Sequence, residues 1–174
     1  SLVGSEMCIR DSDNIKDMNP NYKMNPPLRS KEDVEALKEG LKNGTMDVIS
    51  TDHAPHAKEE KNRSISQAAF GIVGLETSAA LTYTELVKTG YLSVMGMAEK
   101  MSYNPAKVLG LEDKGSVSEG MTADLVIFDP NKQYKIDKST FASKGKNTPF
   151  DGYEVCGEVA YTLVDGKIVY DCNK

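Results

Sequence analysis

The stretch Met46-Asp-Val-Ile-Ser-Thr-Asp-His-Ala-Pro-His56 joins an apolar run to a carboxylate and two imidazoles within five positions. Its first half is rich in apolar and β-branched residues, which predicts a short buried strand over 46–51. Pro55 cannot extend a ladder, so the strand should end near Asp52. In a (β/α)8 barrel, the carboxyl ends of the strands carry the catalytic groups. A carboxylate at such a position could hold a metal ion and also take a proton from metal-bound water, so Asp52 could fill two roles.

The same residues also fit a simpler interpretation. His53 and His56 are the only two histidines in the chain. Taken alone, the cluster could be a turn in which Asp52 accepts hydrogen bonds from backbone amides and both histidines are solvated. Spacing by itself leaves both interpretations open.

Composition narrows the kind of partner. The chain has 174 residues, of which 39% are hydrophobic and 27% charged, as in ordinary globular proteins. Its net charge of −5 and the lack of a Lys/Arg-rich block argue against nucleic acid and anionic membranes. Cys8, Cys156 and Cys172 are far apart and form no C-x-x-C pair, which argues against a disulfide framework or a cysteine zinc site. We expect a cytoplasmic protein whose partner is a small molecule.

The first twelve residues differ from the rest. Residues 1–12 show no clear hydrophobic period and look like translated sequencing adaptor. We therefore expect them to be non-native and leave them out of the fold prediction. The natural sequence is then expected to begin near Asp13, inside a domain, so that the chain is the C-terminal part of a longer protein.

Helical patterns lie on both sides of the predicted strand. Ser30-x-x-Asp33 is typical of a helix start, and apolar residues recur at helical spacing until Asn43-Gly44. Further helices are predicted over 75–87 and 104–110. Loop, helix and strand in this order form the repeating unit of α/β barrels.

Several side-chain environments also follow from the pattern. Met95, Met97 and Met101 are predicted to be core residues rather than ligands. The charged run 58–63 and the lysines of the loop 144–150 are predicted to be solvated.

The last third of the chain changes to short strands. Residues 123–128 predict a buried strand that is closed by Asp129-Pro130, and residues 161–170 predict a hairpin with Asp165-Gly166 at its type I′ turn. We therefore place a second, all-β unit from about residue 113 to the end.

Five motifs cover nearly everything after residue 20: Tyr22-Lys-Met-Asn-Pro-Pro-Leu-Arg29, Thr51-Asp-His-Ala-Pro-His56, Phe70-Gly-Ile-Val-Gly-Leu-Glu-Thr77, Asn104-Pro-Ala-Lys-Val-Leu-Gly-Leu111 and Asn147-Thr-Pro-Phe-Asp-Gly152. Together they resemble the type I dihydroorotases of the amidohydrolase superfamily. The first two are the most discriminating, because allantoinases and dihydropyrimidinases look different after the Asp-His pair. The resemblance implies an α/β fold, in which 13–112 are the C-terminal part of a (β/α)8 TIM-type barrel and 113–174 are part of a small β-sandwich domain.

The resemblance also implies a reaction and a set of roles. The reaction is the reversible hydrolysis of the cyclic amide of dihydroorotate to carbamoyl-aspartate, in pyrimidine biosynthesis, at a two-zinc centre bridged by hydroxide. Asp52 would be a ligand to one zinc and the base that returns its proton to the leaving amide nitrogen. Asn25 and His56 would hold polar groups of the substrate. Phe70 and Gly71 would offer it backbone hydrogen bonds.

Other family features are missing from this chain. In dihydroorotases the other zinc ligands, which are a His-x-His pair, a carboxylated lysine and two further histidines, come from earlier in the sequence, and so does a substrate-binding arginine. Asp52 alone cannot hold two zincs, because a catalytic zinc typically has about three protein ligands. His53 is expected to support the loop rather than bind metal. Ala69 stands where the family pattern has proline. We therefore predict that this chain alone lacks activity and exposes apolar faces.

Two alternatives stay open. The first is another cyclic amidohydrolase of the allantoinase or dihydropyrimidinase type. The second is a non-catalytic homologue that scaffolds aspartate carbamoyltransferase. For a full-length enzyme, the resemblance implies a homodimer and an association with that same transferase.

Overall fold

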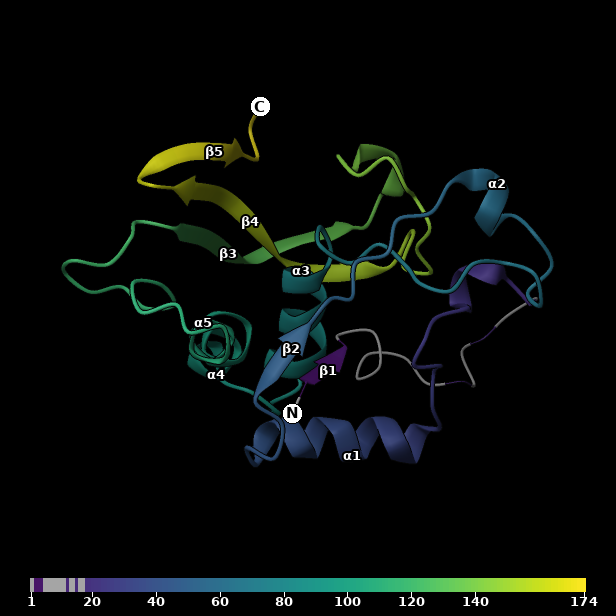
Figure 1. Cartoon of the computed structure of the whole chain (residues 1–174), viewed down its shortest axis with the longest axis horizontal. Coiled ribbons are helices and arrows are strands. Elements are labelled where there is room, and N and C mark those ends of the chain that lie inside the picture. Colours follow the sequence, from purple (N-terminus) through teal and green to yellow (C-terminus); the bar gives the residue numbers. More distant parts are fainter. Residues whose placement is uncertain (1, 5–11, 13–14, 16–17) are drawn as a thin grey trace.

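The computed structural model describes residues 2–4, 12, 15 and 18–174. Most of the segment 1–12, which we expect to be non-native, lies outside the described residues. Helices and strands are mixed along the chain, with a small parallel sheet near the start and an antiparallel sheet at the end (Figure 1). Every helix in the described part is too short or too polar to cross a lipid bilayer.

The first half contains the predicted helix and strand. Helix α1 (Lys31–Lys42) begins after Ser30, whose Oγ accepts a hydrogen bond from the Asp33 amide at 3.2 Å, and it ends at Asn43 as predicted. Strand β2 (Val48–Ser50) pairs in parallel with β1 (Leu2–Gly4). β1 lies in the segment that we left out of the fold prediction, and the non-native origin of that segment stays a prediction.

Short helical pieces follow β2. The predicted helices over 75–87 and 104–110 are confirmed, although each contains or follows a π-helical turn. The pieces are η3 (Pro20–Tyr22), α2 (Lys58–Lys61), α3 (Ser78–Thr82), η4 (Tyr83–Val87), α4 (Val94–Ala98), η5 (Glu99–Tyr103), α5 (Asn104–Val108) and η6 (Lys138–Thr140).

The C-terminal sheet has the strand order β3-β4-β5 and is antiparallel. Its strands are β3 (Leu125–Lys135), β4 (Glu154–Val164) and β5 (Lys167–Asp171). Asp165 and Gly166, with φ of 51° and 71°, form the turn between β4 and β5, so the predicted hairpin is confirmed.

One buried core joins the two halves of the chain. It combines apolar residues from α1, β2, α3, η4 and the segments before α3 and β4, including Leu41, Ile49, Ile72, Leu81, Leu86 and Phe150. Each buried side chain of this size contributes about 1.5–3 kcal/mol to the stability of the fold. The core therefore holds the loop that contains Phe150 close to the segment that contains Ile72.

Two predictions about burial were wrong. β3 is not a buried strand that stops at Asp129-Pro130; it continues through the proline with register shifts. Proline is tolerated there because β3 is an edge strand of its sheet. Val126 and Ile127 are 60% and 53% exposed, and because successive strand residues point to opposite faces, neither face of β3 is fully covered there by the described part of the chain. Met95 is 76% exposed and so is not a core residue.

The prediction of exposed apolar faces is confirmed for the C-terminal sheet. Exposed apolar side chains gather on all three of its strands, namely Val126, Ile127, Val164, Ile168, Val169 and Tyr170. Such a surface on a sheet with open edges favours association with other chains.

Candidate functional site

Asp52 lies two residues after β2, at the point where the chain leaves the strand. Its φ of 44° is left-handed, a conformation that Asp tolerates better than most residues. The residue is exposed, and within the described part of the chain its carboxylate forms no hydrogen bond or ion pair. The carboxylate is therefore open to a metal ion or a substrate.

His53 supports the neighbouring loop. Its Nδ1 accepts hydrogen bonds from the amides of Gly74 at 3.1 Å and Leu75 at 3.3 Å. Because that nitrogen is an acceptor here, the neutral ring carries its proton on Nε2. This agrees with the expected role in loop support.

His56 links the Asp52 loop to Phe70. Its Nε2 lies 2.7 Å from the Phe70 carbonyl oxygen, which can only accept, so the ring donates this hydrogen bond. On the other side, Nδ1 lies 3.7 Å from Glu60 Oε2. A substrate that hydrogen-bonds to Nε2 must therefore take the place of the Phe70 carbonyl.

Gly71 makes a close backbone contact that needs glycine. Its φ is 114°, and a Cβ there would lie 2.5 Å from the Cβ of Ala54. Its amide donates to the Lys23 carbonyl at 3.0 Å, and its carbonyl accepts from Lys61 Nζ and Asn147 Nδ2 at 2.8 and 3.1 Å. Both polar backbone groups of Gly71 are thus engaged within the chain, and a substrate contact at Phe70 and Gly71 stays a prediction.

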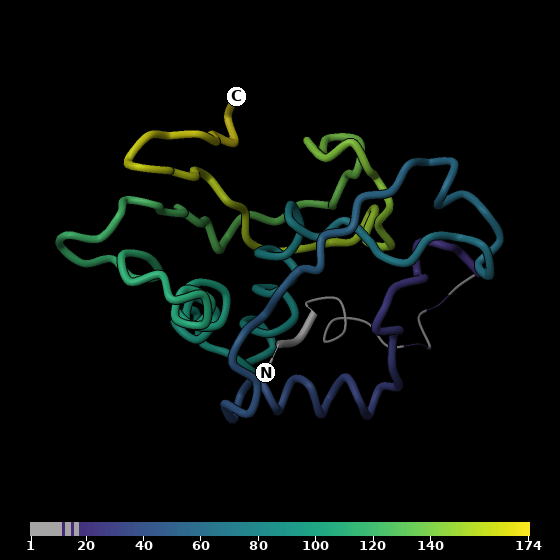
Figure 2. The backbone as a smooth tube through the Cα atoms, viewed as in Figure 1, coloured from purple at the N-terminus to yellow at the C-terminus, as the bar shows by residue number. Residues whose placement is uncertain are grey.

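Asn25 belongs to a segment that lies beside the Phe70 loop (Figure 2). Lys23, two residues earlier, places its Nζ 4.4 Å from the centre of the Phe70 ring and donates to the Ser66 carbonyl at 2.9 Å. Asn25 itself is exposed. The structure thus brings together the segments that carry Asn25, His56, Phe70 and Gly71.

Lys61 is buried at the centre of this arrangement, contrary to the prediction that the run 58–63 is solvated. It is 2% exposed, and its Nζ donates to the carbonyls of Lys23, Ala69 and Gly71 at 2.9, 2.9 and 2.8 Å. No pattern in the sequence separates it from Lys58, which is exposed on the same short helix. Burial lowers the pKa of Lys61 to about 8, with a further contribution from the Lys23 charge.

This pKa predicts a pH effect on stability. The pKa of Lys61 is about 8 in the folded chain and 10.5 in its ordinary environment, so between these pH values the unfolded chain binds more protons. The Lys61 contribution to stability should therefore rise with pH across this window and stay constant below it. We expect the free energy of unfolding of the unmodified chain to increase relative to that of Lys61→Met between pH 8 and 10.5. The measurement is denaturant unfolding at several pH values, with Lys58→Met as control; a difference that does not change with pH would contradict the assignment.

Asn147, in the segment before β4, reaches the same place. It is 5% exposed and contacts both the Asp52 loop and Gly71. The loop around it is less solvated than predicted, because Lys146 is half-buried and its Nζ donates to the Phe141 carbonyl. Apart from its place in a motif, the sequence gives no signal for the role of Asn147.

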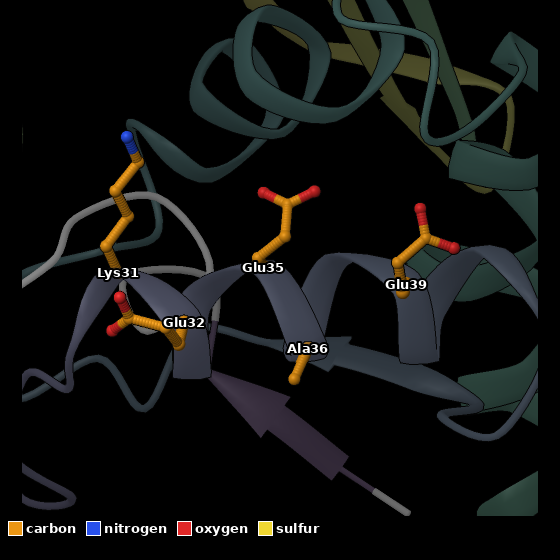
Figure 3. Close-up of a pocket in the computed structure, with 5 residues that line it drawn as sticks. All are labelled: Lys31, Glu32, Glu35, Ala36 and Glu39. Carbon is orange, nitrogen blue, oxygen red and sulfur yellow. The ribbon is translucent and has the colours of Figure 1, made fainter.

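Candidate metal ligands are few. No group of three or more His, Cys, Asp or Glu side chains that could hold a metal ion occurs among the described residues. A hollow along α1 contains none of the predicted site residues (Figure 3). It is lined by Lys31, Glu32, Glu35, Ala36 and Glu39. Asp52 is therefore the one predicted ligand, and it cannot complete a zinc site by itself.

Comparison with known proteins gives the family. The model described as "Amidohydrolase family" matches residues 7–169. A dihydroorotase from Bacillus licheniformis is 52% identical over 164 residues, which are 94% of this chain and 38% of that protein. One from Acetivibrio thermocellus is 50% identical over 154 residues, which are 88% of this chain and 36% of that protein. The chain thus spans less than two fifths of these relatives.

Solved structures are also similar to this chain. An L-hydantoinase (dihydropyrimidinase) from Arthrobacter aurescens has a TM-score of 0.93 and 36% identity, with 98% of this chain and 39% of that chain covered. A dihydropyrimidinase from Brevibacillus agri has a TM-score of 0.90 and 28% identity, with the same coverage of 98% and 39%. The expected mixed α/β structure is confirmed. On the family match and these structural likenesses, the chain belongs to the amidohydrolase family.

Proposed function

We propose that a full-length protein containing this chain is a dihydroorotase, which reversibly hydrolyses the cyclic amide of dihydroorotate to carbamoyl-aspartate in pyrimidine biosynthesis. The likeness to dihydroorotases carries this proposal. It reaches 52% identity over 94% of the chain, whereas the solved L-hydantoinase is 36% identical. The motif that runs from Asp52 to His56 supports the same choice.

The proposed architecture follows the same likeness. Residues 13–112 would be the C-terminal part of a (β/α)8 barrel, and residues 113–174 would be part of a β-sandwich domain. The succession of helix α1 and the buried strand β2 supports the first part, and the antiparallel sheet β3-β4-β5 supports the second. Asp52 would then lie at the carboxyl end of a barrel strand, where such enzymes place their catalytic groups.

In the proposed mechanism, Asp52 is the general base. Its exposed carboxylate would take the proton of the attacking water and deliver it to the leaving amide nitrogen. His56 would donate a hydrogen bond from Nε2 to the substrate in place of the Phe70 carbonyl, and Asn25 would bind another polar group of the substrate. The backbone at Phe70 and Gly71 would border the ring.

Asp52 is also the residue of this chain that would bind metal. A carboxylate oxygen is a suitable zinc ligand, and the open Asp52 side chain fits that role. When bound, a zinc pair would polarise the scissile carbonyl and make the attacking water more acidic. The remaining ligands would have to come from outside the described residues, because these provide no cluster of three donors.

The proposal is tested with a panel of substrates. We expect the full-length protein to have a kcat/KM for dihydroorotate at least about a hundredfold above those for hydantoin and allantoin, because His56 and Asn25 would hydrogen-bond to polar groups of dihydroorotate. A preference for hydantoin or allantoin would instead support another cyclic amidohydrolase, which the structural neighbours favour. If the protein hydrolyses none of the three substrates, the proposal is refuted and the scaffold alternative is favoured.

His56 provides a second test. Replacing it by Ala in the full-length protein should raise KM for dihydroorotate by about tenfold without changing the bound zinc, because one hydrogen bond to the substrate is lost. Steady-state kinetics and elemental analysis measure the two quantities. Loss of zinc from His56→Ala would make the residue a metal ligand and refute its assignment to the substrate.

Homodimer formation and association with aspartate carbamoyltransferase remain predictions from the resemblance, and a cytoplasmic location remains a prediction from the composition. The presence of both Asp52 and His56 argues against the scaffold role.

A further inference from the structure

We propose that Asn147 is a positioning residue that holds the His56 loop against Phe70 and Gly71 at the separation that substrate binding requires. The inference rests on the proposed function for the identity of the substrate. Its geometric part rests on the structure alone.

Both the nitrogen and the oxygen of the Asn147 side-chain amide form hydrogen bonds. Nδ2 donates to the Ala54 carbonyl at 2.9 Å and to the Gly71 carbonyl at 3.1 Å. Oδ1 accepts from the His56 amide at 3.0 Å. One buried side chain thus connects two loops that also meet through the Ala54 amide and the Ile72 carbonyl, through the His56 ring and the Phe70 carbonyl, and through His53 Nδ1 and the amides of Gly74 and Leu75.

An amide suits this place better than other side chains. Two backbone carbonyls need donors and one backbone amide needs an acceptor, and asparagine provides two donors and an acceptor at one carbon. A carboxylate at the same position would keep the acceptor for His56 but would face the Ala54 and Gly71 carbonyls without a proton. Because Asn147 is 5% exposed, water has little access to replace the lost bonds.

The surrounding backbone is fitted closely. A Cβ on Gly145 would lie 2.7 Å from the Cβ of Pro55, and a Cβ on Gly71 would lie 2.5 Å from that of Ala54. The Asn147 carbonyl also accepts from the Val73 amide at 3.0 Å. The segment 54–55 is therefore packed between two backbones, and Asn147 adds hydrogen bonds to Ala54 and His56 on either side of Pro55.

Asn147 belongs to the C-terminal unit, whereas His56 and Gly71 belong to the unit before it. Figure 2 shows the loop that follows β3 returning beside the segment after β2. The C-terminal unit therefore helps to shape the substrate site in addition to packing against the core. A loop displacement of about 1 Å can cost on the order of a hundredfold in rate, so the effect of this contact should be measurable.

The test replaces Asn147 by Asp in the full-length protein, with Thr148→Val as the matched control. Thr148 is 2% exposed in the same loop, and its hydroxyl accepts from the Phe150 amide rather than from the Asp52 or Gly71 loops. We expect Asn147→Asp to raise KM for dihydroorotate by about tenfold or more with kcat within about threefold. Thr148→Val should leave KM within about twofold of the unmodified protein.

A second readout does not depend on turnover. Amide hydrogen exchange in 53–57 and 70–74 should be about tenfold faster in Asn147→Asp and unchanged in Thr148→Val, because only the first variant releases the contact between the loops. If Asn147→Asp does not fold, Asn147→Ser, which removes the reach of the amide without burying a charge, carries the same expectations. Unchanged exchange and unchanged KM in the folded variant would overturn the inference. Faster exchange in a protein that does not hydrolyse dihydroorotate would support the positioning role and overturn the proposed function.

Discussion

Asp52→Asn in the full-length protein should lower kcat for dihydroorotate by about a thousandfold or more while the fold is kept. Asparagine has the same shape and accepts the left-handed φ of 44°, so the loop has no reason to rearrange. The amide cannot take up a proton and is a poorer metal ligand, so both proposed roles are lost together. Steady-state kinetics and thermal unfolding measure the two parts of the prediction.

Asp47→Asn is the control for this variant. Asp47 lies just before the start of β2 and is also exposed, so its replacement makes the same chemical change away from the site. Its kcat should stay within about twofold of the unmodified protein. Residual turnover of Asp52→Asn within about tenfold, a barrier change of only about 1.4 kcal/mol, would refute the assignment of the base.

Gly71→Ala should produce a large loss of stability. The new methyl group would lie 2.5 Å from the Ala54 Cβ, and the φ of 114° is one that alanine rarely adopts. Backbone strain and overpacking together should cost about 2–5 kcal/mol. Denaturant unfolding of the full-length protein measures this cost.

Two further variants separate the clash from the strain. Gly44 has a φ of 82°, but a Cβ added to it would meet no atom within 4 Å, so Gly44→Ala carries strain without a clash. Adding Ala54→Gly to Gly71→Ala removes the Ala54 Cβ, with which the new methyl group would clash. The double variant should recover about half of the lost stability. If Gly71→Ala and Gly44→Ala lose the same stability, and the double variant recovers none of it, the contact between residue 71 and the Ala54 Cβ does not contribute to the loss.

The elements that the sequence predicted well are those specified by neighbouring residues. The Ser30 cap and the Asn43 end define α1, and Asp165-Gly166 defines the last hairpin, through bonds that span only a few positions. The position of Asp52 after a strand follows in the same way, because the apolar run and Pro55 are adjacent to it.

The features that the sequence did not predict depend on distant contacts. Lys61 is buried because it meets the carbonyl of Lys23, which is 38 residues away, and Asn147 is buried because it meets the Asp52 loop, which is over 90 residues away. A lysine in a charged run and an asparagine two residues before a proline are ordinary surface residues by composition. The exposure of β3 was missed for the opposite reason, since its apolar pattern indicates burial that the described chain does not provide.

The most direct test is to count the zinc ions that this chain binds. We propose that the chain supplies the catalytic base and the substrate-binding loops, but Asp52 is the one zinc ligand that we predict in it. Residues 13–174 are expressed, stripped of metal and supplied with zinc, and bound zinc is counted alongside dihydroorotate hydrolysis. A catalytic zinc typically takes about three protein ligands, so we predict fewer than two tightly bound zincs per chain and no measurable turnover. Two tightly bound zincs per chain, or turnover near that of a complete enzyme, would contradict the account.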